Sequence, residues 1–276
     1  MKRIGFTSDI HLDVNTGYLN AQDLYHAAKD LLLDSLIIAG DISNGSSYIP
    51  NLINTFKEID LKFVLGNHDY YIENKKEINS FDIRASFKDL PNYLPLFPLI
   101  TEDYIIIGDT GWYDYSFGPT GYTKSFYDKM KFSSWTWPDK RFCNWIGMTN
   151  EEVSEHFLQI LENQLKQIED KKIIVITHVV PHEDFIMKKE GPYNREWNYN
   201  NAFFGTKKLH ELYKKYNVEK AIFGHTHSKY EKKIDGIEYI CSPVGYYMEI
   251  IENYDFEEMK HITDYLKKRI KILELN

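Results

Sequence analysis

The sequence contains few cysteines and no excess of positive charge. Two cysteines in 276 residues provide neither a disulfide framework nor a cysteine-type zinc site. The 33 basic side chains are outnumbered by 41 acidic ones, which gives a formal net charge of −8. Non-specific binding to nucleic acids or membrane surfaces is therefore disfavoured, because both partners are anionic. Any affinity for phosphate must come from a local feature of the chain.

Long apolar runs are missing as well. The start of the chain, MKRIGFTSDIHLD, has two basic residues but no apolar segment before Asp9, so no signal peptide is expected. No apolar stretch approaches the roughly 20 residues needed to span a bilayer. Together with the low cysteine content, this predicts a soluble, cytoplasmic protein. G-x-G-x-x-G and Walker-type motifs are also absent, so no nucleotide cofactor is expected.

Short apolar runs alternate with helical patterns along most of the chain. Strands are predicted in RIGFTSD, SLIIAGD, KFVLGN, DYIIIGD, KIIVITH, EKAIFGH and IEYICS. A long amphipathic helix should begin at Thr149, because Glu152 three residues later completes a capping box. The tail FEEMKHITDYLKKRIKILEL predicts a helix and then a closing strand. The alternation favours an α/β fold. The length allows one large core or at most two small ones, and we expect a single domain over residues 1–276.

Polar side chains follow five of the predicted strands at the point where each strand ends. In open α/β sheets this carboxyl edge is where ligands bind. Residues two apart on extended backbone point to the same side, so the D-x-H and H-x-H pairs can each face one ion. Seven nitrogen and oxygen groups are too many for one tetrahedral site, but they suit two adjacent divalent ions such as Mn²⁺, Fe²⁺/³⁺ or Zn²⁺. The candidate ligands are Asp9, His11, Asp41, Asn67, His178, His225 and His227.

Each of these motifs alone also has a purely structural explanation. D-x-H and G-D can be turns after strands, and G-N-H-D is rich in residues that favour turns. His178 alone could be a core or surface histidine. The two histidines of GHTH, by contrast, have no ordinary turn rationale. All five motifs in this order, each at a strand end, favour metal chemistry.

The ordered set D-x-H, G-D, G-N-H-D, H and G-H-x-H resembles the calcineurin-like metallophosphoesterase family. The resemblance implies a four-layer α/β/β/α sandwich, in which two mixed β-sheets are flanked by helices. It also implies two metal ions that share Asp41, and a non-ligand role for His68 near the leaving group. One ion would be held by Asp9, His11, Asp41 and His227, and the other by Asp41, Asn67, His178 and His225.

One position departs from the family pattern. Many members carry G-D-x-x-D, and the second acid contacts the catalytic histidine. Here the run is GDISN, so Asn44 takes that place. An amide can orient the imidazole of His68 but cannot stabilise its cation by charge.

The reaction implied is hydrolysis of a phosphoester by in-line attack of a metal-bridging hydroxide, with His68 as the general acid. We expect a small or nucleotide-type phosphodiester as the substrate. A phosphomonoesterase, including a phosphoprotein phosphatase, is the alternative. A nuclease fits less well, because no basic groove interleaved with aromatic residues is evident outside the insert. A non-catalytic metal-holding protein is disfavoured by the complete ligand set.

Residues 110–150 and 191–204 break the regular pattern and contain all five tryptophans. Their aromatic content argues against disorder, and long irregular loops are usually functional. We expect most of these rings to pack a satellite core. The alternative is that both segments form a cap over the site. Substrate contacts are predicted at Asn44 beside His68 and at His182 near His178, and a cap would add Trp112 and Arg195.

Overall fold

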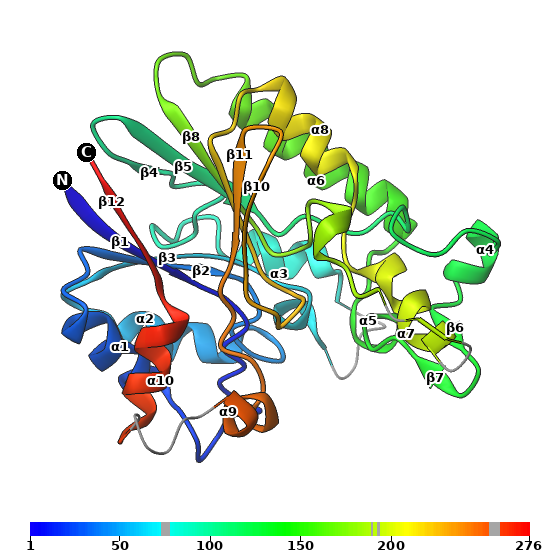
Figure 1. Ribbon diagram of the computed structural model, residues 1–276, viewed down its shortest axis with the longest axis horizontal. Helices are drawn as coiled ribbons and strands as arrows, with labels where there is room; N and C mark the ends of the chain where they lie inside the picture. Colours follow the sequence, from blue (N-terminus) through cyan, green and yellow to red (C-terminus); the bar gives the residue numbers. More distant parts are fainter. Residues whose placement is uncertain (73–77, 189, 192–193, 254–259) are drawn as a thin grey trace.

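Two mixed β-sheets lie face to face in the centre of the molecule (Figure 1). The computed structural model describes residues 1–72, 78–188, 190–191, 194–253 and 260–276. In the first sheet, three parallel strands are joined at one edge by an antiparallel strand. Its order is β12 (Lys271–Leu275), β1 (Lys2–Thr7), β2 (Ser35–Ala39) and β3 (Asp60–Val64).

The second sheet has four parallel strands in its middle and an antiparallel strand at each edge. Its order is β10 (Tyr230–Ile234), β11 (Ile237–Cys241), β9 (Lys220–Phe223), β8 (Lys172–Thr177), β5 (Tyr104–Asp109) and β4 (Leu99–Ile100). Strand β10 was not predicted. Its sequence YEKKI is mostly charged and its three central residues are exposed, as is common for strands that protect a sheet edge from further pairing.

The central strands are buried on both faces, which explains their continuous apolar runs. In β2, Ile37 and Ala39 belong to the core between the two sheets, whereas Leu36 and Ile38 belong to the core beneath the helices. In β8, Ile174 and Ile176 likewise point between the sheets, and Ile173 and Val175 point outwards. This period of two fixes the register of each strand between the layers.

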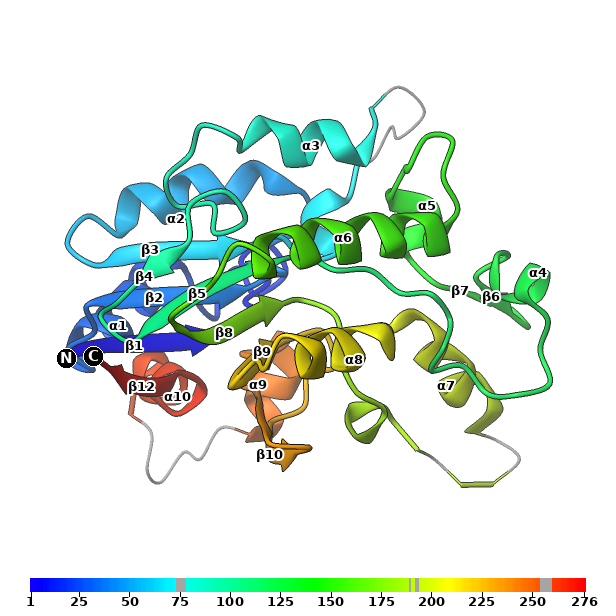
Figure 2. The same ribbon diagram turned by 90° about the horizontal axis from the view of Figure 1, so that it is seen from above.

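Helices cover the outer face of each sheet (Figures 1 and 2). The first sheet is covered by α1 (Ala21–Asp30), α2 (Ile49–Thr55) and α10 (Ile262–Arg269), which share a core with its outer residues. The second is covered by α6 (Asn150–Leu165) and α8 (Lys208–Lys215). The predicted arrangement of two mixed sheets flanked by helices is therefore confirmed. Within the described residues, every helix is too short or too polar to traverse a lipid bilayer.

The capping box at the start of α6 is also confirmed. The Thr149 hydroxyl accepts from the Glu152 N–H, and the Glu152 carboxylate accepts from the Thr149 N–H. The tail contains the predicted helix and strand as α10 and β12, although the first part of that helix prediction, residues 256–259, lies outside the described residues. The other regular elements are α3 (Ser80–Ser86), α9 (Tyr247–Asn253) and the short 3₁₀ turns Ser46–Tyr48, His68–Tyr70 and Glu183–Phe185.

The two irregular segments contain short elements and pack on each other. The first holds α4 (Lys124–Tyr127), the hairpin of β6 (Lys131–Phe132) and β7 (Trp135–Thr136), and α5 (Asp139–Phe142). The second, which the sequence patterns left without regular structure, holds α7 (Arg195–Asn200) and a 3₁₀ turn, Asn201–Phe203. Tyr127 stacks on Tyr199 with ring centroids 5.3 Å apart, and Tyr113 meets Phe203 at 5.5 Å. These aromatic contacts make one satellite core from both segments.

A buried ion pair anchors α3 to the end of β5. Asp109 is 1% exposed and follows a glycine, as Asp41 does after β2. Its carboxylate accepts from the Arg84 guanidinium at 2.5 Å, so this strand-end acid is neutralised by a side chain of the scaffold. Asp109 is thus a structural residue and not a further candidate ligand.

Replacing Arg84 with Met should leave a buried, unpaired carboxylate at Asp109 and destabilise the fold by about 3–5 kcal/mol. Urea unfolding monitored by circular dichroism measures the change. The control is Lys29→Met, which breaks the exposed pair with Glu58 and should change the free energy of unfolding far less. Equal losses in the two variants would contradict the structural role of the Arg84–Asp109 pair.

Candidate metal centre

The seven candidate ligands come together where five strands end. Asp9 and His11 follow β1, Asp41 follows β2, and Asn67 follows β3. His178 follows β8, and the two histidines of GHTH follow β9. Side chains from both sheets therefore meet at one edge of the sandwich. Asp9, His11, Asp41, Asn67 and His178 are at most 1% exposed.

The backbone at most of these residues is in the left-handed region. The φ angles are 52° at Asp9, 47° at His11, 55° at Asp41, 72° at His225 and 53° at His227. Positive φ is uncommon outside glycine, and such conformations cluster at functional sites because the surrounding fold must enforce them. Five of seven candidate ligands share this property, which the sequence patterns alone did not reveal.

Glycines next to the ligands make the close approach of these loops possible. A Cβ at Gly66 would lie 2.1 Å from Asp41 Oδ1, and a Cβ at Gly224 would lie 2.7 Å from Asp9 Oδ2. The glycines of G-N-H-D and G-H-T-H therefore leave room for carboxylates from the other strands.

Three ligand atoms converge around His178. Its Nε2 atom lies 3.0 Å from Asn67 Oδ1, 3.1 Å from His225 Nδ1 and 3.3 Å from Asp41 Oδ2. The opposite ring nitrogens are held by backbone carbonyls: His178 Nδ1 by Ala39 O at 2.9 Å, and His225 Nε2 by Phe203 O at 3.2 Å. Because a carbonyl only accepts, both outward nitrogens carry a proton, and the inward nitrogens are acceptors, and thus ligand atoms, when the rings are neutral.

A second group surrounds His227. Its Nε2 atom lies 3.1 Å from His11 Nε2 and 3.5 Å from Asp9 Oδ1. Its Nδ1 atom is 2.7 Å from the Glu249 carboxylate of α9, which fixes the ring with Nε2 pointing inwards. Asp9 is oriented in turn by the backbone N–H of His225, at 2.9 Å from Oδ1.

Asp41 lies between the two groups. Its Oδ1 atom accepts from the His68 backbone N–H at 2.9 Å. Its Oδ2 atom is left facing both sides, at 3.3 Å from His178 Nε2 and 3.8 Å from His11 Nε2. Clusters able to hold a metal ion are Asp9–His11–His227, His11–Asp41–His68 and Asp41–His178–His225.

The electrostatics of the centre favour a positive charge among these acceptors. Burial alone would lower the pKa of His178, but the neighbouring Asp41 carboxylate raises it to about 9. Burial, and then His178, lowers the pKa of His225 to about 3. One proton on His178 can therefore satisfy part of the cluster at neutral pH, whereas a divalent cation would satisfy all the converging acceptors at once. The donor set fits the two-ion interpretation.

His68 lies beside this centre, and its ring is held by Asn44. The Nδ1 atom of His68 is 2.6 Å from Asn44 Oδ1, so the predicted contact between these residues is present. Its Nε2 atom is 3.9 Å from Asp41 Oδ2, and its ring stacks on Tyr71 with centroids 4.3 Å apart. Asp69 does not orient His68. It accepts instead from the backbone N–H groups of Ile42, Ser43 and Gly66, and so ties together the loops after β2 and β3.

The other predicted substrate contacts lie elsewhere. Trp112 is 1% exposed, enclosed by Tyr70 and Trp145, and donates its indole N–H to Asn150. A ring enclosed in this way packs against the core, and a substrate contact at Trp112 stays a prediction. His182 packs on His210 with centroids 4.6 Å apart and accepts from the Asp184 N–H, away from the candidate ligands. Arg195 begins α7 and is exposed.

Several residues that the sequence patterns missed contact the centre. Glu249 holds His227 through a hydrogen bond. The ring centroid of Tyr246 lies 4.3 Å from that of His11 and 4.5 Å from that of His227. Asp139 of α5 accepts from the Asn67 amide at 2.8 Å. No motif spacing connects these positions with the ligands, because their contacts arise only from the tertiary fold.

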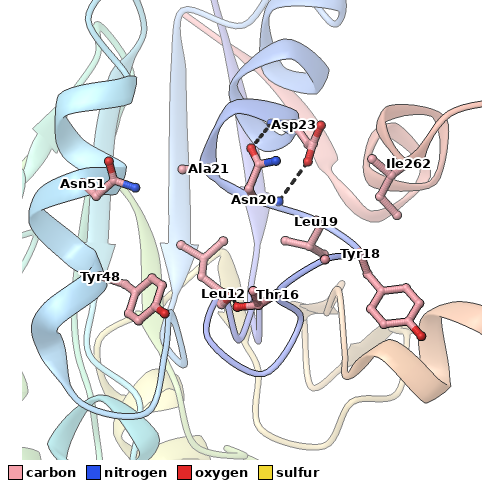
Figure 3. A pocket seen from close by; sticks show the side chains of 11 residues that line it. Leu12, Thr16, Tyr18, Leu19, Asn20, Ala21, Asp23, Tyr48, Asn51 and Ile262 are labelled. Carbon is pink, nitrogen blue, oxygen red and sulfur yellow. Dashed lines mark hydrogen bonds between the residues drawn. The ribbon is translucent and has the colours of Figure 1, made fainter.

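Figure 3 shows a cavity of about 460 Å³ beyond the loop that follows β1. Leu12, Thr16, Tyr48 and Ile262 are among its lining residues, and none of the seven candidate ligands lines it. The polar side chains labelled at its upper end, Asn20 and Asp23, form the capping box of α1. The cavity is therefore separate from the candidate metal centre.

Comparisons with known proteins agree with this geometry. The family model for calcineurin-like phosphoesterases matches residues 2–229. The chain is 26% identical over 264 residues to the uncharacterized protein L509 of Acanthamoeba polyphaga mimivirus, covering 89% of this chain and 92% of that protein. Its fold is similar to that of a phosphopantetheinyl hydrolase (PptH) from Mycobacterium tuberculosis, with a TM-score of 0.73, 17% identity, and coverage of 98% and 95% of the two chains.

Asp41→Asn should lower metal occupancy on both sides of the centre, because the carboxylate faces His11 and His178 through one oxygen atom. Elemental analysis of purified wild type and variant measures the metal content. Asp69→Asn, which removes an equally buried carboxylate that contacts only backbone groups, measures how much occupancy is lost when the same loops are loosened without removal of a ligand. Two tightly bound ions in Asp41→Asn would contradict a shared ligand.

Proposed function

The chain belongs to the calcineurin-like phosphoesterase family, and from this membership we propose that it hydrolyses a small phosphodiester with an organic leaving group. Family membership makes it a metal-dependent phosphoesterase. The single observation that carries the proposal is the convergence of acceptor atoms around His178 and His227, with Asp41 Oδ2 between them. In this family such a centre holds two metal ions.

The proposed ligands of one ion are Asp9, His11, Asp41 and His227, and those of the other are Asp41, Asn67, His178 and His225. When bound, two such ions supply a nucleophile from water at neutral pH and neutralise charge on the phosphate. The side chains then have three tasks. The ligands hold the ions, and the outer hydrogen bonds of the ligand rings keep these rings in place. His68 donates a proton to the leaving oxygen.

The position of His68 supports a general-acid role. Asn44 fixes the Nδ1 side of the ring, so that Nε2 faces the edge of the centre near Asp41. A proton on Nε2 could be delivered to an oxygen atom that leaves from that side. The Tyr71 ring stacked on His68 restricts its rotation and keeps this orientation.

The charges around the centre support a diester over a monoester. Within the described residues, no lysine or arginine forms an ion pair with Asp9 or Asp41. Among the described residues, the charge of these two carboxylates is therefore not offset by a lysine or arginine partner. A phosphomonoester carries close to two negative charges at neutral pH, whereas a diester carries one. Because the carboxylates offset part of the charge of the ions, the centre suits the singly charged substrate.

A cavity of about 530 Å³ beside His68 supports an organic group on the leaving side. His68, Tyr71 and Phe142 form a continuous stack along it, with the second pair of rings 5.0 Å apart. Its size is typical of small-molecule sites. The protein of similar fold from Mycobacterium tuberculosis is a phosphopantetheinyl hydrolase, and a phosphate ester with an extended organic group has the chemistry that this cavity would accept. The remaining lining residues are Asp13, Asn44, Tyr48 and Ile72.

With Mn²⁺ present, kcat/KM should be higher for bis(4-nitrophenyl) phosphate than for 4-nitrophenyl phosphate, because both share one leaving group and differ in charge. Release of nitrophenol measures both rates. A clear preference for the monoester would replace the proposal with a phosphomonoesterase. Turnover of neither ester, by protein with both ions bound, would contradict the phosphoesterase proposal itself.

His68→Ala should retain both metal ions but lower kcat by about 10²–10⁴-fold, as expected for loss of a general acid. The loss should shrink for aryl esters with more acidic leaving groups, which need less protonation. A leaving-group series with metal analysis of the same samples provides the measurement. Loss of one ion would instead make His68 a ligand, in line with its place in the His11–Asp41 cluster.

A further inference from the structure

Asp139 is a buried carboxylate that receives four hydrogen bonds. It is 2% exposed and lies at the start of α5, in the first irregular segment. Its Oδ1 atom accepts from Asn67 Nδ2 at 2.8 Å and from the Tyr71 hydroxyl at 2.7 Å. Its Oδ2 atom accepts from the Tyr113 hydroxyl at 3.0 Å and from Trp137 Nε1 at 2.9 Å. A carboxylate only accepts hydrogen bonds, so all four neighbours act as donors.

This arrangement decides which end of the Asn67 amide faces the metal centre. The amide has one acceptor end and one donor end, and Asp139 can be satisfied only by the donor end. The oxygen atom is therefore turned inwards, 3.0 Å from His178 Nε2. In the flipped amide, the NH₂ group would face that same nitrogen and present no ligand atom to an ion.

We propose that Asp139 is the positioning residue that keeps the Asn67 oxygen directed at the metal centre. The first irregular segment, which carries Asp139, thereby controls the affinity of the centre for one of the two ions. The inference rests on the proposed ligand role of Asn67. The second irregular segment, which packs on the first, also holds a ligand: its Phe203 carbonyl accepts from His225. Two of the four proposed ligands on this side are thus oriented by residues outside the two sheets.

The substitution Asp139→Asn gives a specific expectation. The amide introduced at position 139 would have one accepting and one donating end, and its accepting end must face Trp137, because an indole N–H can only donate. Its NH₂ group would then face Asn67 and require the Asn67 oxygen to turn away from the centre.

The double variant Asp139→Asn/Trp137→Phe separates amide orientation from loss of charge. Without the indole N–H, the NH₂ group of residue 139 can face Tyr113, whose hydroxyl can accept as well as donate. The oxygen of residue 139 can then face Asn67 and restore its orientation, although the charge of Asp139 is still missing. Trp137→Phe alone keeps Asp139 and the Asn67 contact, and it serves as the matched control.

Mn²⁺ titrations of metal-free protein, with free Mn²⁺ measured by electron paramagnetic resonance, test the proposal without an activity assay. Wild type and Trp137→Phe should bind two ions. Asp139→Asn should bind one ion normally and the other about 10–100-fold more weakly, as is typical for loss of a hydrogen bond that orients a ligand. The double variant should recover the second affinity to within about threefold.

Two results would overturn the proposal: normal affinity for both ions in Asp139→Asn, or no recovery in the double variant, which would assign the loss to charge. Thermal unfolding after EDTA treatment establishes that each variant is folded. If Asp139→Asn alone does not fold, the double variant decides, because failure to bind the second ion would assign the affinity to the charge of Asp139 and overturn the proposal. If the wild type binds no Mn²⁺, the proposed metal centre itself is contradicted. That result differs from both results that would overturn the role of Asp139.

Discussion

The structure depends on a cluster of hydrogen-bond acceptors that face one another at the joint edge of two sheets. Lone pairs of His225, Asn67 and Asp41 lie 3.0–3.3 Å from His178 Nε2. Such a cluster is electrostatically unfavourable unless positive charge lies within it. The left-handed backbone at five ligands and the glycines beside them are the local cost of forming it, and the two packed sheets supply the rigidity that maintains it.

Four of the inward acceptors are fixed by a group on their outer side. Ala39 O and Phe203 O hold two histidines, Glu249 holds a third, and Asp139 holds the amide. The first belongs to a central strand, whereas the others come from loops and short helices outside the sheets. The sheets thus determine where the ligands begin, and the peripheral segments determine where their polar atoms point. This division assigns the aromatic segments a role in supporting the site from behind, which differs from a cap that contacts the substrate.

Much of the fold and the ligand set could be predicted because both depend on local sequence order. Buried strands appear as apolar runs, and Asp9, Asp41 and His178 directly follow such runs. The role of Trp112 could not be read from the sequence, because a large aromatic residue in an irregular segment has the same sequence signature whether it packs or binds. Asp139 lies 72 residues from Asn67, and its role depends on a tertiary contact that no periodicity encodes. The charged edge strand β10 likewise carries no apolar alternation.

The most direct test of a two-ion centre shared through Asp41 is a crystal structure of the Mn²⁺-loaded protein with anomalous scattering recorded at the manganese edge. The account predicts two anomalous peaks. One should lie among Asp9, His11, Asp41 and His227, and the other among Asp41, Asn67, His178 and His225, with Asp41 contacting both. A single peak, or two peaks of which one lies away from Asn67 and His178, would contradict it.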